Sequence, residues 1–345
     1  MKGLVKYDFG PGNAELRELP VPEPGAGEVR IKVLKAGICG SDMHVYHYDS
    51  QLSLKPPVVM GHEFVGRIDK LGAGVEGYEL GQKVTSEIGV GVDQTCEHCQ
   101  DGLTNMCVHR RSIGYVIDGC FAEYITVPAR YLVPVAEGID DLVGAMIEPL
   151  ACCCRCCFDV TPMHAGDVVL VAGAGPMGLM NAQVAKANGA TVVITDVATG
   201  AARLEMAKSL GIDYAVNVEE EDLHALIGKL TNGYGADAAI ECSGTDAGLN
   251  TCLDEVRKDG YVTEFAIGAA TAQVNMSNVI YREVQLRGSM STNPHNWRQA
   301  VRLLDRGLVD LAPLATEFKL DDWQAAFDYF DTHEGYKIVF SISED

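Results

Sequence analysis

The chain has 345 residues, of which 47% are hydrophobic and 22% charged, and its formal net charge is −21. This length is sufficient for two domains with hydrophobic cores of their own. The acidic balance argues against nucleic acid and anionic membranes as partners, because both attract basic surfaces. A solvated acidic surface is the simplest explanation of the charge.

Composition also bears on location. The first twenty residues lack the apolar core of a signal peptide. The most apolar stretch, residues 168–197, is interrupted by Gly, Pro, Asn, Gln and Lys, which is unlike a membrane span. We therefore expect a cytoplasmic protein, in which the twelve cysteines serve as thiols and metal ligands rather than as disulfides.

The region from residue 1 to about 150 has the pattern of an antiparallel β domain. Short runs of alternating apolar and polar residues are separated by Pro and Gly. We expect strands at residues 29–34, 65–68 and 121–127, and a further strand and turn at 71–75.

Four side chains in this region are of the types that bind a zinc ion. Cys39 offers a thiolate, His62 an imidazole, and Glu63 or Glu148 a carboxylate. A catalytic zinc needs a few protein ligands and one open position for water or the substrate oxygen. Such an ion lowers the pKa of a bound alcohol and assists the departure of hydride.

Residues close to these candidates suggest supporting roles. Ser41 and His44 are candidates to carry the released proton to solvent, and Asp42 to accept the second ring proton of His62. Taken singly, a cysteine is usually a core residue and a histidine a hydrogen-bonded one, but the constellation favours a metal site. For four further residues a place in the substrate pocket and a surface role are equally consistent: Tyr46, His47, Tyr48 and Asn293.

The hydrophobic pattern of the sequence changes near Ala151, where strand patterns begin to alternate with helix patterns. This alternation predicts a parallel sheet covered by helices on its faces. We expect strands at residues 167–172, 191–196, 236–241 and 260–265, with helices at 175–188 and 201–210. The last fifty or so residues are expected to return to the first domain, with helices at 295–306 and 322–330 and a strand at 337–342.

A glycine fingerprint follows the first of these strands and indicates a dinucleotide site. Its glycines allow a tight turn and let the backbone approach a pyrophosphate, and the following helix N-terminus attracts the phosphates. Asp196 ends the next strand, where a carboxylate accepts hydrogen bonds from the ribose hydroxyls and repels a 2′-phosphate. The candidate cofactor residues are Gly173, Gly175, Pro176, Met177, Gly178, Asp196 and Arg203.

Arg203 is the first basic residue after Asp196, so NAD is favoured over NADP. The loops at residues 241–244 and 266–268 end later strands of the same sheet and are expected to face the cofactor. A tight turn without a nucleotide is the alternative interpretation of the fingerprint.

A cluster of five cysteines at residues 152–157 lies on a predicted helix that starts just after Pro149. Consecutive helical residues point about 100° apart, so five thiolates cannot converge on one ion. We expect these side chains to pack the helix as small hydrophobes, with oxidation sensitivity or incidental metal binding as the alternative. The same packing role is expected for Cys120, Cys242 and Cys252.

Over its whole length the chain resembles the zinc-containing medium-chain dehydrogenase/reductase family, and within it the sorbitol (polyol), galactitol-phosphate and threonine dehydrogenases. The resemblance rests on residues 37–42, 61–63, 148–150 and 173–178. It implies an α/β protein with a GroES-like antiparallel domain at 1–150, completed by about 291–345, and a Rossmann NAD-binding domain at 151–290. It also implies a catalytic zinc at Cys39, His62 and Glu63, with Glu148 a ligand or near-ligand, an active site in the interdomain cleft, and a homodimer or homotetramer.

The resemblance extends to a second zinc site, a structural lobe with the spacing C-x2-C-x2-C-x7-C. Cys96, Cys99 and Cys107 match the last three positions, and Asp93 stands in the first. A carboxylate can bind zinc, so Asp93 is the expected fourth ligand, with Glu97 and His98 as fallback candidates. Four protein ligands leave no open position, so this metal would hold a loop in place. A metal-free loop with three reduced thiols is the alternative.

The expected reaction is oxidation of a secondary hydroxyl of a polyol, sugar acid or related small alcohol, with reversible hydride transfer to NAD. Glu148 before Pro149 fits the polyol enzymes, but residues 289–293 replace the Arg-Tyr pair that touches substrate in the sorbitol enzymes. The alternatives are a threonine or other amino-alcohol dehydrogenase, a zinc-free quinone or enone reductase, and a nucleotide-binding structural or regulatory protein without turnover. The zinc-free reductase and the protein without turnover leave Cys39 and His62 unexplained.

Overall fold

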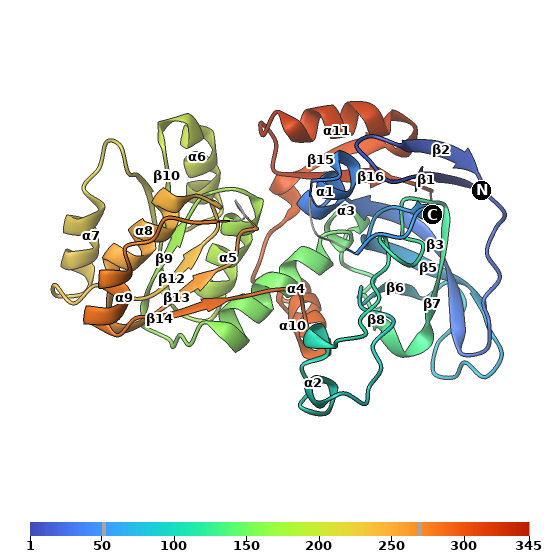
Figure 1. Cartoon of the computed structure of the whole chain (residues 1–345), viewed down its shortest axis with the longest axis horizontal. Helices are drawn as coiled ribbons and strands as arrows, with labels where there is room; N and C mark the ends of the chain where they lie inside the picture. Colours follow the sequence, from blue (N-terminus) through green and yellow to red (C-terminus); the bar gives the residue numbers. More distant parts are fainter. Residues whose placement is uncertain (50–52, 268–270, 345) are drawn as a thin grey trace. The chain divides into compact units, whose positions relative to one another are not determined.

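A computed structural model describes residues 1–49, 53–267 and 271–344 of the chain (Figure 1). The chain divides into two compact units. Unit 1 consists of Met1–Pro149, Thr292–Asp305 and Leu311–Asp345, and unit 2 of Leu150–Ser291 and Arg306–Asp310. Gly268, which was expected in a cofactor loop, lies outside the described residues.

Unit 1 contains a sheet in the order β15-β16-β3-β5-β6-β8, with β7 also paired to β3, and a small sheet in the order β2-β1-β4. All of these pairs are antiparallel except β15 with β16. The strands are β1 (Lys2–Lys6), β2 (Ala14–Glu18), β3 (Glu28–Gly37), β4 (Val58–Val59), β5 (Glu63–Leu71), β6 (Lys83–Ser86), β7 (Tyr124–Pro128), β8 (Leu132–Pro134), β15 (Ala315–Lys319) and β16 (Lys337–Ser341).

The central strand β3 shows why this sequence forms a sheet. Its β-branched residues Val29, Ile31 and Val33 alternate with polar residues and are buried. On one side β3 pairs with β5, and on the other its end pairs with β16 near the C-terminus. Strand β16, near the C-terminus, therefore lies next to the end of β3. The end of β3 in turn lies just before Cys39 in the sequence.

The helices of unit 1 are α1 (Gly40–His47), α2 (Glu97–Gln100), α3 (Asp141–Gly144), α10 (Pro294–Asp305) and α11 (Trp323–Asp331). Figure 1 shows α2 in a loop apart from the sheets. Two expectations for unit 1 were wrong in detail. Residues 72–75 form only a turn, because β5 itself runs on to Leu71 opposite Val29. The strand expected from residue 121 begins at Tyr124, because the amide of Phe121 donates to Met60 in a loop instead.

Unit 2 is a six-stranded parallel sheet in the order β11-β10-β9-β12-β13-β14. The strand order reverses at β9, which is the arrangement of dinucleotide-binding sheets. Its strands are β9 (Val168–Ala172), β10 (Thr191–Asp196), β11 (Tyr214–Asn217), β12 (Ala236–Glu241), β13 (Val256–Glu264) and β14 (Gln285–Gly288). Its helices are α5 (Pro176–Ala187), α6 (Ala201–Ser209), α7 (Leu223–Leu230), α8 (Asp246–Glu255) and α9 (Met276–Arg282).

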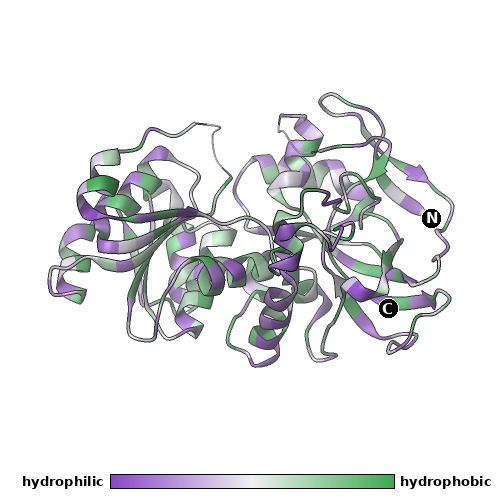
Figure 2. Ribbon diagram, turned by 60° about the horizontal axis from the view of Figure 1, so that its bottom comes forward, coloured by the Kyte–Doolittle hydropathy of each residue, from purple (hydrophilic) through white to green (hydrophobic). Residues whose placement is uncertain are grey.

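The core of unit 2 forms because its middle strands are apolar on both faces. All five residues of β9 are buried, as expected for a strand covered on both sides. On one face, Leu170 and Ala239 pack in a cluster with Ile227 of α7 and Leu253 of α8. In Figure 2 the middle strands of this sheet are largely green, whereas the surrounding helices carry both green and purple.

One helix departs from its predicted limits. α4 (Ile147–Arg155) starts before Pro149, because proline is tolerated in the first helical turn. It then continues as a π-helical turn, η3 (Cys156–Val160), so a regular helix does not describe the whole cysteine cluster. Four of the five cysteines are nevertheless buried, namely Cys153, Cys154, Cys156 and Cys157.

The fold class expected from the sequence is confirmed, with a mainly antiparallel β unit and a doubly wound parallel sheet. Among the described residues, no helix has both the length and the apolar character needed to cross a bilayer.

Candidate metal centre and nucleotide site

Three of the predicted zinc-type side chains come together in unit 1. Cys39, His62 and Glu63 each offer a ligand atom, and these atoms lie within 4.8 Å of one another. Cys39 follows β3 and caps α1, while Glu63 begins β5 and pairs with Gly37 at the end of β3. The group therefore forms where two neighbouring strands meet a helix N-terminus.

The backbone before His62 requires a glycine. Gly61 has a φ of +86°, and a Cβ atom there would lie 2.3 Å from the ring of Phe121. Any other residue would be strained and would clash with this buried ring. Gly61 therefore fixes the direction in which the chain enters His62 and Glu63.

The ring of His62 is buried and has two polar neighbours at Nδ1. The hydroxyl oxygen of Tyr115 lies 3.1 Å away, and Oδ1 of Asp42 lies 3.4 Å away. Oδ2 of Asp42 accepts a hydrogen bond from the amide of Cys39 at 2.9 Å, whereas its buried Oδ1 accepts none from the described residues. Burial opposes the imidazolium, but the charges of Asp42 and Cys39 outweigh it and raise the pKa of His62 well above its usual range.

Glu63 is held by a buried lysine. Nζ of Lys337 donates to Oε1 of Glu63 at 2.7 Å and to the carbonyl of Ile38 at 2.8 Å, and it lies 2.6 Å from Oε2 of Glu63. Burial lowers the pKa of Lys337, but the charges of Glu63 and Cys39 outweigh this effect and raise it. Lys337 stays protonated and neutralises a carboxylate that is completely buried.

The other predicted residues lie around this group. Glu148 is buried in the first turn of α4, outside the three-residue group. Burial raises the pKa of Tyr115, and the charges of Asp42, Cys39 and, to a smaller extent, Glu148 add to this rise. The hydroxyl of Ser41 lies 2.7 Å from that of Tyr115. His44 follows one helical turn later, is partly exposed, and contacts Asp49 through Nδ1 at 2.7 Å.

Sequence reasoning missed two residues of this site, Tyr115 and Lys337. Tyr115 belongs to a loop with no local motif, and no signal in the sequence points to it. Lys337 is separated from Glu63 by 274 positions. Its one signal is a lysine at the start of an apolar strand, because a buried lysine needs an anionic partner.

The four residues with undecided roles are placed as follows. The ring of Tyr46 packs edge-on against Phe327, with ring centroids 5.2 Å apart. His47 lies 3.1 Å from a carboxylate oxygen of Asp331, and Tyr48 is exposed. Asn293 is buried, and its Oδ1 accepts hydrogen bonds from Thr104 and from the amide of Asn105, both at 3.3 Å.

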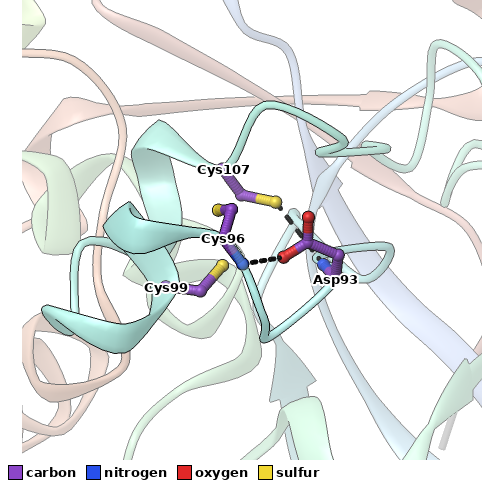
Figure 3. Close-up of side chains that lie close together, drawn as sticks. All are labelled: Asp93, Cys96, Cys99 and Cys107. Atoms are coloured by element: carbon purple, nitrogen blue, oxygen red, sulfur yellow. Dashed lines mark hydrogen bonds between the residues drawn. The ribbon is translucent and has the colours of Figure 1, made fainter.

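A second group of metal-type ligands lies around α2 in the same unit. Asp93, Cys96, Cys99 and Cys107 offer ligand atoms within 4.8 Å of one another, and Figure 3 shows the four side chains gathered in one place. Oδ1 of Asp93 accepts hydrogen bonds from the amides of Thr95 at 2.9 Å and Cys96 at 3.0 Å. Glu97 and His98 are not part of the group.

The electrostatics of this lobe fit a bound cation. Burial and the neighbouring thiols of Cys96 and Cys107 raise the pKa of Cys99 to about 12. Backbone hydrogen bonding at Cys99 lowers the pKa of Cys96. The amides of Cys96 and Thr95, together with His109, lower the pKa of Asp93. A cation removes the repulsion that keeps neighbouring thiols protonated, and three sulfurs with one carboxylate are a donor set that suits zinc.

The glycine fingerprint of unit 2 has the geometry expected of a phosphate-binding loop. Gly173 has a φ of +99°, and a Cβ atom at Gly178 would lie 1.8 Å from the carbonyl oxygen of Gly173. Gly175 caps α5 and has open space where its side chain would be. The loop is thus closed tightly at two glycines and open at the third, next to the N-terminus of α5.

Asp196 ends β10 beside this loop. Its Oδ2 accepts a hydrogen bond from the amide of Ala174 at 3.3 Å, and its Oδ1 accepts one from Val197 at 2.8 Å. Nη1 of Arg203 lies 3.8 Å from Oδ2. The carboxylate predicted to meet a ribose is therefore adjacent to the fingerprint.

Two further carboxyl groups lie side by side at the same end of the sheet. Glu241 on β12 is in register with Glu264 on β13. Glu241 accepts hydrogen bonds from the amides of Ser243 at 2.7 Å and Gly244 at 3.0 Å. Burial and the charge of Glu241 raise the pKa of Glu264 to about 7. The sequence analysis did not identify these two acids as neighbours.

Comparison with known proteins places the chain in a family. Residues 25–137 match the alcohol dehydrogenase GroES-like domain, and residues 176–306 match the zinc-binding dehydrogenase domain. A sorbitol dehydrogenase of Halalkalibacterium halodurans is 39% identical over 343 residues, which cover 99% of each chain. An L-threonine 3-dehydrogenase of Anaeromyxobacter sp. (strain K) is 36% identical over 346 residues, which cover 98% of each chain.

A solved structure shares the fold along the whole chain. It is described as a short chain alcohol dehydrogenase from Escherichia coli CFT073 in complex with NADH, with a TM-score of 0.87, 29% identity and 99% coverage of both chains. The chain belongs to the zinc-containing medium-chain dehydrogenase/reductase family, as its motifs predicted. It is an enzyme of the alcohol and polyol dehydrogenase class.

Proposed function

We propose that this enzyme oxidises a secondary hydroxyl of a polyol, sugar acid or related small alcohol and transfers hydride reversibly to NAD. The observation that carries the proposal is the convergence of a thiol, an imidazole and a carboxylate at Cys39, His62 and Glu63. The fingerprint beside Asp196 supplies a site for the hydride acceptor. Together these features match the needs of metal-assisted hydride transfer.

Zinc, when bound by Cys39, His62 and either Glu63 or Glu148, supplies a Lewis acid that lowers the pKa of the substrate hydroxyl. Ser41 accepts the proton from the substrate and releases its own hydroxyl hydrogen toward His44, which passes a proton on to solvent from the partly exposed side of α1. Asp42 and Tyr115 hold the ring of His62 through Nδ1, which leaves Nε2 for the metal.

The cofactor proposal rests on the loop geometry of unit 2. The open space at Gly175 and the N-terminus of α5 suit a pyrophosphate, flanked by the remaining fingerprint residues Gly173, Pro176, Met177 and Gly178. Asp196 suits the ribose hydroxyls and repels a 2′-phosphate. Arg203 is paired with Asp196, so this pairing competes with any contact between Arg203 and a 2′-phosphate. NADH is expected to bind at least about 10-fold more tightly than NADPH, and Asp196→Ala to reduce that ratio.

The substrate proposal favours polyols over amino alcohols. The polyol choice is supported by Glu148 before Pro149 and by the sorbitol dehydrogenase relative at 39% identity. The L-threonine 3-dehydrogenase relative, at 36% identity, makes threonine the second candidate. Glu148 favours the first, because the threonine enzymes usually have aspartate there.

A substrate screen with metal analysis tests the proposal. NAD reduction is measured over polyols, sugar acids and L-threonine, with Cys39→Ser as the inactive control. We expect turnover with polyols or sugar acids that is lost when zinc is removed. Turnover with threonine alone favours the second candidate, and turnover that survives zinc removal indicates a zinc-free reductase. NADH binding without oxidation of any alcohol favours a regulatory protein.

We also infer that the enzyme forms a homodimer or homotetramer in the cytoplasm. Support for self-association comes from the edge strand β14, whose four residues are exposed, and from exposed Ile280 and Tyr281 on the preceding helix α9. Light scattering is expected to give the mass of a dimer or tetramer, and Ile280→Glu to reduce it. A monomer for the unchanged chain contradicts this inference.

A further inference from the structure

Tyr115 contacts Ser41 as well as His62, and its part in holding the His62 ring does not explain the contact with Ser41. Its side chain is buried, and its ring lies 5.3 Å from the ring of His62 between centroids. Its hydroxyl oxygen lies 2.7 Å from Oγ of Ser41 and 3.1 Å from Nδ1 of His62. One hydroxyl group thus joins the expected proton carrier to the expected metal ligand.

Hydrogen-bond chemistry determines which group donates and which accepts in the series His62, Tyr115 and Ser41. A histidine that binds a metal through Nε2 carries its proton on Nδ1 and must donate it. The phenol oxygen of Tyr115, at 3.1 Å, accepts a hydrogen bond from that N–H, and Oδ1 of Asp42 lies farther away at 3.4 Å. A tyrosine phenol carries a single hydrogen at neutral pH, so Tyr115 can donate one hydrogen bond.

Within the part of the chain that the structure describes, the acceptor close to that hydrogen is Oγ of Ser41, at 2.7 Å. Ser41 accepts a hydrogen bond from Tyr115, so once it has taken the substrate's proton and released its own, the hydrogen it keeps points toward the substrate oxygen. Once the alcohol has lost its proton, and again when the ketone is reduced, that oxygen carries negative charge and needs a hydrogen-bond donor. When His62 donates to Tyr115 and Tyr115 donates to Ser41, the hydroxyl of Ser41 is that donor.

We propose that Tyr115 is a positioning residue for hydride transfer, acting through Ser41 and His62 rather than by touching substrate. It orients the Ser41 hydroxyl as a donor to the substrate oxygen and fixes the His62 ring. This inference rests on the proposed function, because Ser41 faces a substrate oxygen only if the neighbouring metal binds an alcohol.

The first test is Tyr115→Phe, which removes the hydroxyl and keeps the ring. We expect kcat to fall about 10-fold or more, with KM changed less than about 3-fold and the zinc content unchanged. The matched control is Tyr131→Phe, a buried tyrosine of the same unit whose hydroxyl accepts from Arg130. An unchanged kcat for Tyr115→Phe, or an equal loss in the control, overturns the proposal.

A double-mutant cycle separates positioning from a general structural effect. If Tyr115 acts through Ser41, adding Tyr115→Phe to Ser41→Ala costs less than about 3-fold in kcat, although alone it costs about 10-fold. Losses that multiply in the double variant contradict action through Ser41.

A third measurement does not depend on turnover. In zinc-loaded protein with ¹⁵N-labelled histidine, the Nδ1 proton of His62 is identified by its loss in His62→Gln. Its resonance is expected to move upfield in Tyr115→Phe, because the closer acceptor is gone. An unchanged resonance overturns the assignment of Tyr115 as the partner of His62. If the unchanged enzyme oxidises no alcohol, the proposed function fails, and this resonance still decides whether Tyr115 holds His62.

Discussion

Lys337 and Glu63 form a buried ion pair across a glycine. Their strands, β16 and β5, are both neighbours of β3 and do not pair with each other. Gly37 of β3 lies in register between them, opposite Val339 and Glu63. A Cβ atom at Gly37 would lie 2.3 Å from Oε2 of Glu63 and 3.3 Å from Cε of Lys337. The missing side chain is what allows the two charges to meet.

The first prediction concerns this pair. Lys337→Met leaves the carboxylate of Glu63 buried without its cation, and we expect the free energy of unfolding to fall by about 3–5 kcal/mol. Urea denaturation measures this change. Adding Glu63→Gln is expected to restore part of the loss, because the uncompensated charge is removed. Lys319→Met, at an exposed position of β15, is the control and should leave stability within about 0.5 kcal/mol.

The second prediction concerns the lobe around α2. If Asp93 is the fourth ligand, the unchanged chain holds about two zinc ions and Asp93→Ala about one, as measured by elemental analysis after dialysis. Asp93→Cys should keep about two, because it restores a four-sulfur site. Glu97→Gln is the control, since Glu97 lies outside the group. Two zinc ions in Asp93→Ala would show that another ligand completes the site.

The third prediction compares two glycines of the fingerprint. A methyl group at Gly175 meets nothing within 4 Å, so Gly175→Ala should preserve the melting temperature. It should nevertheless weaken NADH binding about 10-fold or more, because the methyl group enters the space proposed for the pyrophosphate. Gly178→Ala forces an atom to 1.8 Å from the carbonyl oxygen of Gly173 and should lower the melting temperature itself. Unchanged NADH affinity in Gly175→Ala would place the pyrophosphate elsewhere.

What the sequence allowed us to predict depended on how local each feature is. The strand, fingerprint and helix of 168–187 follow one another directly, so pattern and turn chemistry sufficed to place them. Cys39 is distant in sequence from His62 and Glu63, but the pairing of β3 with β5 brings the three residues together. Their residue types identified them as candidate zinc ligands.

Features that arise from tertiary packing were not predictable in this way. Tyr115 meets His62 through a loop, and Lys337 meets Glu63 through the space above Gly37. Neither contact leaves a periodic signal. The π-helical turn after Arg155 also had no signal, because its buried cysteines are compatible with an ordinary helix.

The last prediction uses the carboxyl pair at the end of β12 and β13. The pKa of Glu264 is raised to about 7 in the fold by burial and by Glu241, from an ordinary value near 4.5 in the unfolded chain. Between these two pH values the folded state binds more protons, so this group makes the protein less stable as pH rises toward 7. The full penalty applies above that range, where the folded protein must hold both charges.

Glu264→Gln removes the penalty and keeps a donor toward Glu241. Without added nucleotide, we expect it to raise the melting temperature by about 1–3 °C at about pH 8 and by less at about pH 5. Thermal denaturation at the two pH values measures this difference. Glu220→Gln, on the exposed surface of the same unit, is the control and should show no such pH dependence. Equal stabilisation at both pH values would mean that packing, rather than the charge of Glu264, determines the effect.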